Sequence, residues 1–215
     1  MVNLIYKQFE RTATMKREEQ LSQTHAAILD AASRQFLAQG YQGTSTRDIA
    51  KEVGITQPAL YHHFSDKEII YLEVIKQVGA TVREGINAAV KQIKASDVSD
   101  PVAALTTVTE VLTTAHPRDV FTVIHGSFKY LKPENQHALG QVFMQDYLLP
   151  LQKVFELPVM SLREGLPAKD AAAFYLTSLS PLFNTFHHVG PADADQHEQT
   201  LALVRLILFG VAVEK

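Results

Sequence analysis

A lysine stands at the start of a predicted helix in the segment Ser65–Glu68, an arrangement suited to binding an anion. A cation in the first turn of a helix opposes the helix macrodipole, so helix formation alone gives no reason for Lys67. The same helix start offers free backbone N–H groups to an anion. The segment therefore predicts a phosphate held between the Lys67 ammonium group and the first turn.

The residues before Lys67 predict two short helices joined by a tight turn. Ser45 and Asp48 have the spacing of a capping box, which starts the first helix. Gly54 ends this helix, because glycine enters a left-handed conformation without a Cβ penalty. Pro58 suits the first turn of the second helix, where no N–H group is needed.

The second short helix has an inner and an outer face. Leu60 and Phe64 lie four residues apart and point inward. The outer face carries Gln57, Pro58, Ala59, Tyr61, His62 and His63. Two short helices around such a turn form a helix-turn-helix, and a second helix of two turns can lay its N-terminal end into a major groove.

Residues 24–70 resemble the signature of the TetR family of transcriptional regulators. The resemblance lies in Thr-Ser, Asp-Ile-Ala, Gly-Ile-Thr, Leu-Tyr-His-His-Phe and Ser-Asp-Lys-Glu, in this order and spacing. It implies an all-helical fold with an N-terminal three-helix helix-turn-helix domain that binds DNA. A larger C-terminal helical domain would bind a ligand and dimerise. The remainder of the chain matches the family in helical pattern and length.

The resemblance also implies DNA contacts at individual positions. Phosphate contacts are implied for Thr44, Ser45 and Lys67, and a phosphate or base contact for Arg47. Base reading is implied for Gln57, Pro58 and Ala59, backbone clamping for Tyr61 and His62, and a DNA contact of unspecified kind for Thr56. Tyr61 has the alternative of a core aromatic. We expect no metal site at the adjacent histidines, since neighbouring side chains on a helix diverge by about 100° and no acidic or cysteine partner is near.

Glycine and proline divide the whole chain into helical segments. We expect helices at 23–38, 46–53, 57–64, 65–82, 83–95, 101–114, 118–131, 134–156, 168–188 and 195–213. The domains predicted are an extension over 1–20, the helix-turn-helix domain over 21–67 with a connecting helix to about 82, and the C-terminal domain over 68–215. Met15 is an alternative start; if the longer form is real, Lys7, Arg11, Lys16 and Arg17 offer a flexible basic arm, with a tail without function as the alternative.

Composition narrows the class of protein. The 215 residues include no cysteine, which excludes disulfides and thiolate chemistry. The net charge of −3 is uneven: residues 1–67 hold eight basic and seven acidic residues, and the remainder holds 12 basic and 16 acidic. No secretory signal, membrane span, catalytic motif or cofactor motif is present, so we expect a soluble, cytoplasmic protein that is not an enzyme and needs no cofactor.

The last two predicted helices suit a homodimer. Residues 201–211 are apolar nearly all round, so this helix must be covered on more than one side. Small residues at 171–173, 177, 178 and 180 permit close packing. We therefore expect a four-helix bundle from two subunits, with a wholly intramolecular core as the alternative.

Aromatic residues between 118 and 190 could line an effector pocket. The candidates are His125, Phe128, Phe143, Tyr147, Tyr175, Phe183 and His187. Aromatic residues at helical spacing also form plain core, and this alternative stays open for each.

These patterns predict a ligand-responsive repressor that acts as a homodimer on palindromic double-stranded DNA. A ligand would act by favouring one arrangement of the two reading heads, with the fourth helix as the lever. Activation in place of repression stays open. So does a helical protein-interaction adaptor that keeps the fold without binding DNA.

Overall fold

The computed structural model describes residues 2–96, 98–116, 118–183, 189–191 and 193–210, with side chains except those of 2–14, 120 and 121. Its contacts divide the chain into two compact units, Met1–Val74 and Ile75–Lys215. Every regular element in the described ranges is a helix, which confirms the all-helical class.

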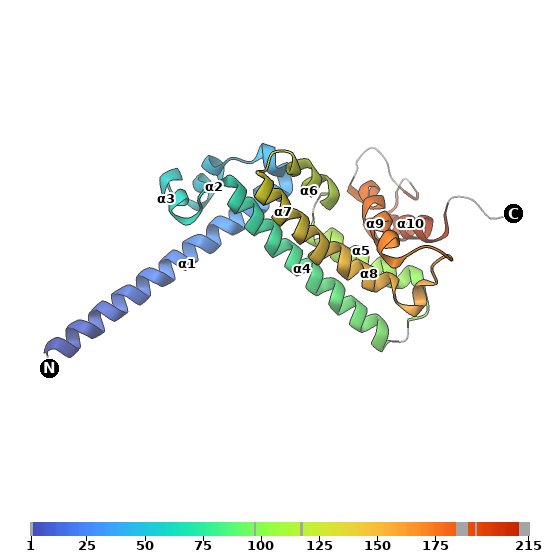
Figure 1. Ribbon diagram of the computed structural model, residues 1–215, viewed down its shortest axis with the longest axis horizontal. Helices are drawn as coiled ribbons and strands as arrows, with labels where there is room; N and C mark the ends of the chain where they lie inside the picture. The colour runs from blue at the N-terminus through green and yellow to red at the C-terminus, as the bar shows by residue number, and fades with distance from the viewer. Residues whose placement is uncertain (1, 97, 117, 184–188, 192, 211–215) are drawn as a thin grey trace. The chain divides into compact units, whose positions relative to one another are not determined.

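The N-terminal unit holds the predicted helix-turn-helix (Figure 1). Its elements are α1 (Val2–Gly43), α2 (Thr46–Val53), α3 (Gln57–His63) and the first part of α4 (Lys67–Ala95). The apolar stripe of α1 is confirmed: Ile28, Ala32 and Phe36 are each 0% exposed. Ile49 of α2 and Leu60 of α3 are equally buried, so three helices share one core.

The C-terminal unit continues α4 and adds the remaining helices. They are α5 (Pro101–Ala115), α6 (Val120–Phe128), α7 (Pro133–Val142), η1 (Phe143–Leu148), α8 (Leu149–Phe155), η2 (Pro158–Met160), α9 (Ala168–Ser178), η3 (Ser180–Phe183) and α10 (Gln196–Phe209). The η1 segment is a π-helix, so residues 133–155 run as α7, one π-helical segment and α8. A π-helical segment inside an α-helix often marks a functional position.

Several predicted helix boundaries are wrong. The first helix begins at Val2 rather than at residue 23, and it kinks at Gly40 with φ 76°. No break follows Val82, because α4 keeps burying one face: Val82 and Ile86 are 0% exposed and Ile93 is 6% exposed.

The helix predicted over 168–188 ends at Ser178. The short 3₁₀ segment Ser180–Phe183 follows, and Pro181 explains the change, since proline lacks the N–H that an α-helix needs and restricts the residue before it. The last helix ends at Phe209 beside Gly210, whose φ is 78°. Residues 211–213, which the prediction included, lie outside the described residues.

Polar pairs in the core of the C-terminal unit join distant segments. Asp146 of η1 is 6% exposed and forms an ion pair with Arg83 of α4. The hydroxyl of Tyr147 lies 2.8 Å from Nε2 of His116, and burial lowers the pKa of this histidine to about 4. These two pairs join segments that are far apart in the sequence and so help to fix how the helices pack.

Gly79 of α4 faces the π-helix without a side chain. A Cβ added there would stand 2.9 Å from Oδ2 of Asp146 and 3.1 Å from Cγ1 of Val142. We expect Gly79→Ala to destabilise the protein by about 1–3 kcal/mol through overpacking, despite the better helix propensity of alanine. Denaturant unfolding followed by circular dichroism measures this change.

Gly140 of α7 supplies a matched control, because a Cβ there would meet nothing within 4 Å. We expect Gly140→Ala to stabilise the protein by about 0.5–1 kcal/mol. Equal effects of the two substitutions would contradict the close contact between α4 and η1.

Candidate nucleic-acid interface

Local capping places α2 and α3 where the sequence predicts them. Ser45 is the N-cap of α2: its Oγ accepts from the Asp48 N–H at 3.1 Å and lies 2.5 Å from the Asp48 carboxylate. Gly54 ends α2 in the left-handed region, with φ 78° and ψ 26°. Thr56 then caps α3, its Oγ1 accepting from the Ala59 N–H at 3.3 Å. These three capping residues confirm the predicted helix-turn-helix.

A polar cluster on the surface joins α1 to α2. Arg34 Nη2 donates to Oε1 of Glu52 at 2.7 Å, and Gln35 Nε2 donates to Oε2 at 2.6 Å. The hydrogen bond from Gln35, followed by that from Arg34, lowers the pKa of Glu52. Glu52 therefore stays ionised at neutral pH and holds the outer end of α2 against α1.

The outer face of α3 is exposed. Gln57, Pro58 and His62 are exposed, and Tyr61 is 44% exposed. The alternative that Tyr61 is a core aromatic is therefore wrong.

The other predicted DNA contacts differ in exposure. Arg47 and Thr56 are exposed, whereas Ser45, Ala59 and Lys67 are half-buried. Thr44 is only 3% exposed and its hydroxyl donates to the Gly40 carbonyl oxygen at 3.0 Å. Its side chain therefore stabilises the kink in α1 and is not part of the exposed surface.

Thr46, which the sequence analysis did not single out, connects two residues of this surface. Its Oγ1 accepts from Nε2 of Gln57 at 2.9 Å and lies 3.1 Å from the Tyr61 hydroxyl. Thr46 is itself 7% exposed. The sequence signal was slight, since a hydroxyl residue directly after an N-cap is common and its partners lie one helix away.

The surroundings of Lys67 differ from the prediction in two ways. Its Nζ lies 4.3 Å from the centroid of the Tyr41 ring, and burial lowers the pKa of the lysine. A cation–π contact of about 0.5–2 kcal/mol gives a folding reason for Lys67 that the sequence did not reveal. The N-cap of α4 is also Asp66, whose carboxylate accepts from the Ile69 N–H at 3.0 Å, and not Ser65. The phosphate contact of Lys67 stays a prediction.

The histidines at the end of α3 lie in different environments. His62 is exposed, whereas His63 is half-buried, and burial, with His25 nearby, lowers the pKa of His63. Within the described ranges, no group of three His, Asp or Glu side chains is placed to hold a metal ion. The same residues include no helix long and apolar enough to cross a membrane.

The structure brings together only some of the predicted pocket residues. The rings of His125 and Phe143 are 5.7 Å apart, and those of Phe143 and Tyr147 are 6.0 Å apart. Tyr175 is not part of this group of rings. Its ring packs edge-on against that of Phe155, and its hydroxyl lies 2.8 Å from the Thr109 hydroxyl.

The remaining predicted pocket residues lie apart from these rings. Phe128 is 42% exposed and Phe183 is half-buried. His187 lies outside the described residues.

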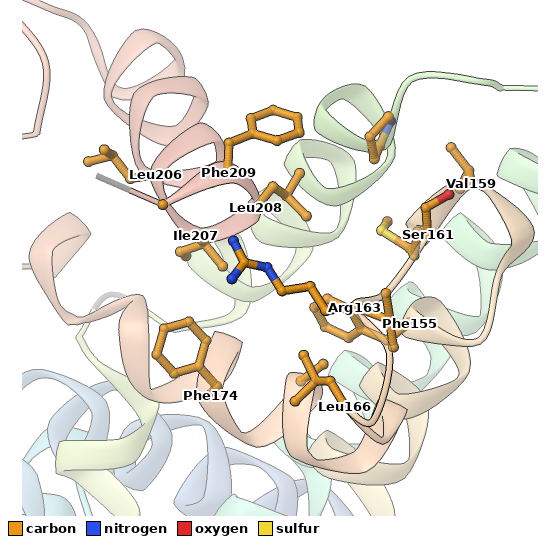
Figure 2. A pocket seen from close by; sticks show the side chains of 15 residues that line it. Phe155, Val159, Ser161, Arg163, Leu166, Phe174, Leu206, Ile207, Leu208 and Phe209 are labelled. Atoms are coloured by element: carbon orange, nitrogen blue, oxygen red, sulfur yellow. The ribbon is translucent and has the colours of Figure 1, made fainter. Parts of the chain in front are cut away.

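A cleft of about 410 Å³ lies in the C-terminal unit, at the end of α10 (Figure 2). Its walls are mainly apolar, with Phe155 and Phe174 facing Leu206 and Phe209 of α10. Arg163 extends across it in the direction of α10. Of the predicted pocket residues that lie within the described ranges, none lines this cleft.

Fold and surface define a class of protein: an all-helical chain whose N-terminal unit presents a helix-turn-helix. Residues 28–74 match the family model "Bacterial regulatory proteins, tetR family". The transcriptional repressor AcnR of Corynebacterium diphtheriae is 37% identical over 65 residues, which are 30% of this chain and 34% of AcnR. The chain thus spans about a third of the length of this curated relative.

Solved structures match over most of the chain. The TetR-family regulator PfmR of Thermus thermophilus is 27% identical with a TM-score of 0.57, over 86% of this chain and 99% of that one. AibR, in complex with isovaleryl coenzyme A and operator DNA, has the same fold at 21% identity and a TM-score of 0.59, over 87% and 98%. Residues 28–74 thus match the N-terminal domain of the TetR family, and most of the chain shares the fold of these solved regulators.

Gly54 forms the turn between α2 and α3 in a left-handed conformation. A Cβ there meets no atom within 4 Å, so the cost of Gly54→Ala is conformational. We expect a loss of about 1–2 kcal/mol in the free energy of unfolding. Gly54→Asn should lose less, since asparagine tolerates this conformation better. Thermal unfolding measures both, and equal loss in the two variants would contradict the explanation.

Proposed function

We propose that the protein is a transcriptional regulator that binds palindromic double-stranded DNA as a homodimer and represses transcription until a small molecule binds. The observation that best supports this function is the outer face of α3, where Gln57 is exposed and Tyr61 is 44% exposed. AcnR is a transcriptional repressor and AibR was solved with operator DNA, which supports this function. Such a regulator would act in the cytoplasm.

The chemistry of the surface supports contact with a duplex. Gln57 and Pro58 lie at the N-terminal end of α3, the end that enters the major groove in a helix-turn-helix. Arg47 and Lys67 add cations, and Tyr61 and His62 add hydrogen-bonding groups for the backbone. The net charge of −3 is compatible with this, because only a local positive face is needed.

A homodimer through α9 and α10 supplies the second reading head. A recognition helix of two turns gives little affinity alone, and dimers place two of them about 34–36 Å apart. Phe174 of α9 and Phe209 of α10 are 61% and 59% exposed, and Leu206 is 41% exposed. Exposed aromatic and aliphatic side chains around an apolar cleft suit an interface between two copies of the chain.

The effector is proposed to bind in the C-terminal unit. AibR, which shares the fold, was solved with isovaleryl coenzyme A, so short acyl-coenzyme A thioesters are the first class to test. The helix α4 holds Lys67 in one unit and Arg83 in the other. A ligand that favours one packing of Arg83 and Asp146 would therefore act on the helix that also carries Lys67.

Salt dependence tests DNA binding. We expect Lys67→Ala to lower the slope of log K against log salt concentration by about one unit, because one phosphate contact is lost. Lys153→Ala, at an exposed position of α8 outside the proposed surface, is the control and should leave the slope unchanged. The measurement is fluorescence anisotropy on a duplex enriched from a random pool. An unchanged slope for Lys67→Ala removes this contact, and failure to enrich any duplex contradicts DNA regulation and favours the adaptor.

Sedimentation tests the dimer. We expect Phe174→Glu to raise the dimer dissociation constant by at least about tenfold, since a carboxylate would be buried between apolar groups. Phe128→Glu changes an exposed phenylalanine of α6 that is outside the proposed interface, and it should leave the dimer intact. A monomeric wild-type protein, or equal weakening by both substitutions, would contradict the assignment to α9 and α10.

A further inference from the structure

Thr46 is almost buried, yet its hydroxyl contacts Gln57 and Tyr61, two exposed residues on the outer face of α3. The residue is the first of α2, and it is 7% exposed. Its Oγ1 accepts from Nε2 of Gln57, 11 residues along the chain, and meets the hydroxyl of Tyr61, 15 residues along. One oxygen atom therefore ties the first and the fifth residue of α3 to the start of α2.

We propose that Thr46 is a positioning residue that sets the base preference of Gln57, an inference that rests on the proposed DNA binding. A free glutamine side chain samples many rotamers, and ordering it on DNA has an entropic cost. The hydrogen bond to Thr46 restricts those rotamers before DNA arrives. Affinity gained in this way is preorganisation rather than a new contact.

The hydrogen bond also decides which groups of the carboxamide stay available. Nε2 has two N–H groups, and one of them is donated to Thr46. The Oε1 acceptor and the second N–H remain for a base. An acceptor together with a donor is the combination with which a glutamine recognises adenine in the major groove. We therefore expect Gln57 to favour adenine only while Thr46 holds it.

The same oxygen orients Tyr61. The phenol is 44% exposed, so its ring edge and hydroxyl lie at the surface while the hydroxyl contacts Thr46. A hydroxyl anchored in this way has one position from which to meet the DNA backbone. Thr46 thus fixes the positions of Gln57 and Tyr61 relative to each other. We expect this to determine which base pair Gln57 meets when Tyr61 contacts the DNA backbone.

Thr46→Val tests the proposal, because valine keeps the shape of threonine and removes the hydroxyl. Thr46→Ser, which keeps the hydroxyl, is the matched control. The full-length protein is used to enrich duplexes from a random pool, and affinities are measured on the enriched duplex and on every single base-pair change. Gln57→Ala identifies the base pair that Gln57 reads.

We expect Thr46→Val to reduce discrimination at that base pair by about tenfold and to leave discrimination elsewhere within about twofold. Thr46→Ser should keep the wild-type preference. In a double-mutant cycle, Thr46→Val should have almost no further effect in the Gln57→Ala background. Uniform weakening across all sequences, or full discrimination in Thr46→Val, would overturn the proposal.

A measurement without DNA separates this inference from the proposed function. In the free protein, the ¹⁵N-labelled side-chain amide of Gln57 should shift in Thr46→Val and keep its position in Thr46→Ser. Unchanged amide resonances in Thr46→Val overturn the positioning role even where DNA binding holds. A shifted amide in a protein that enriches no duplex leaves the contact confirmed and contradicts both the DNA function and the reading role built on it.

Discussion

The turn at Gly54 sets the direction in which α3 leaves α2, and the whole candidate interface depends on that direction. With φ at 78°, the chain reverses so that the Gly54 and Ile55 N–H groups donate to the last carbonyl groups of α2, at 3.2 and 3.0 Å. Leu60 then reaches the core at 0% exposure. With Leu60 buried, Gln57 and Tyr61 remain exposed at the surface of α3. Packing and recognition are thus set by one backbone conformation.

The parts of the fold that could be predicted are those fixed by adjacent residues. The helix α2 runs over the predicted range because Ser45 caps one end and Gly54 the other. Such signals are local and act at both ends. The cap of α4 shows the limit, since Ser65 and Asp66 both have capping side chains and the structure uses Asp66. Likewise, the unbroken course of α4 past Val82 depends on buried contacts with segments far away in the sequence.

The residues of the candidate site likewise include some that the sequence could predict and some that it could not. The exposed residues of α3 could be predicted, because Leu60 and Phe64, four residues apart, point inward and the rest of this short helix is left mainly at the surface. Thr46 could not, since its importance lies in partners 11 and 15 residues away. The predicted pocket residues show a related limit: Tyr147 and Tyr175 are both fully buried, and their hydroxyls pair with His116 and Thr109, far away in the sequence. An aromatic pattern shows that a residue is enclosed, but not whether protein or ligand encloses it.

The helix α4 has residues in both compact units. Lys67 contacts Tyr41 near its start, and Arg83, about four turns further along, contacts Asp146 in the π-helix. An ion pair with one partner nearly buried is sensitive to its surroundings, since the desolvation of Asp146 is balanced only while Arg83 stays in place. The missing side chain at Gly79 allows the π-helical segment to approach α4 closely. A change at Asp146 therefore acts on α4 within the C-terminal unit, and α4 is also the helix whose first residue, Lys67, contacts Tyr41 within the N-terminal unit.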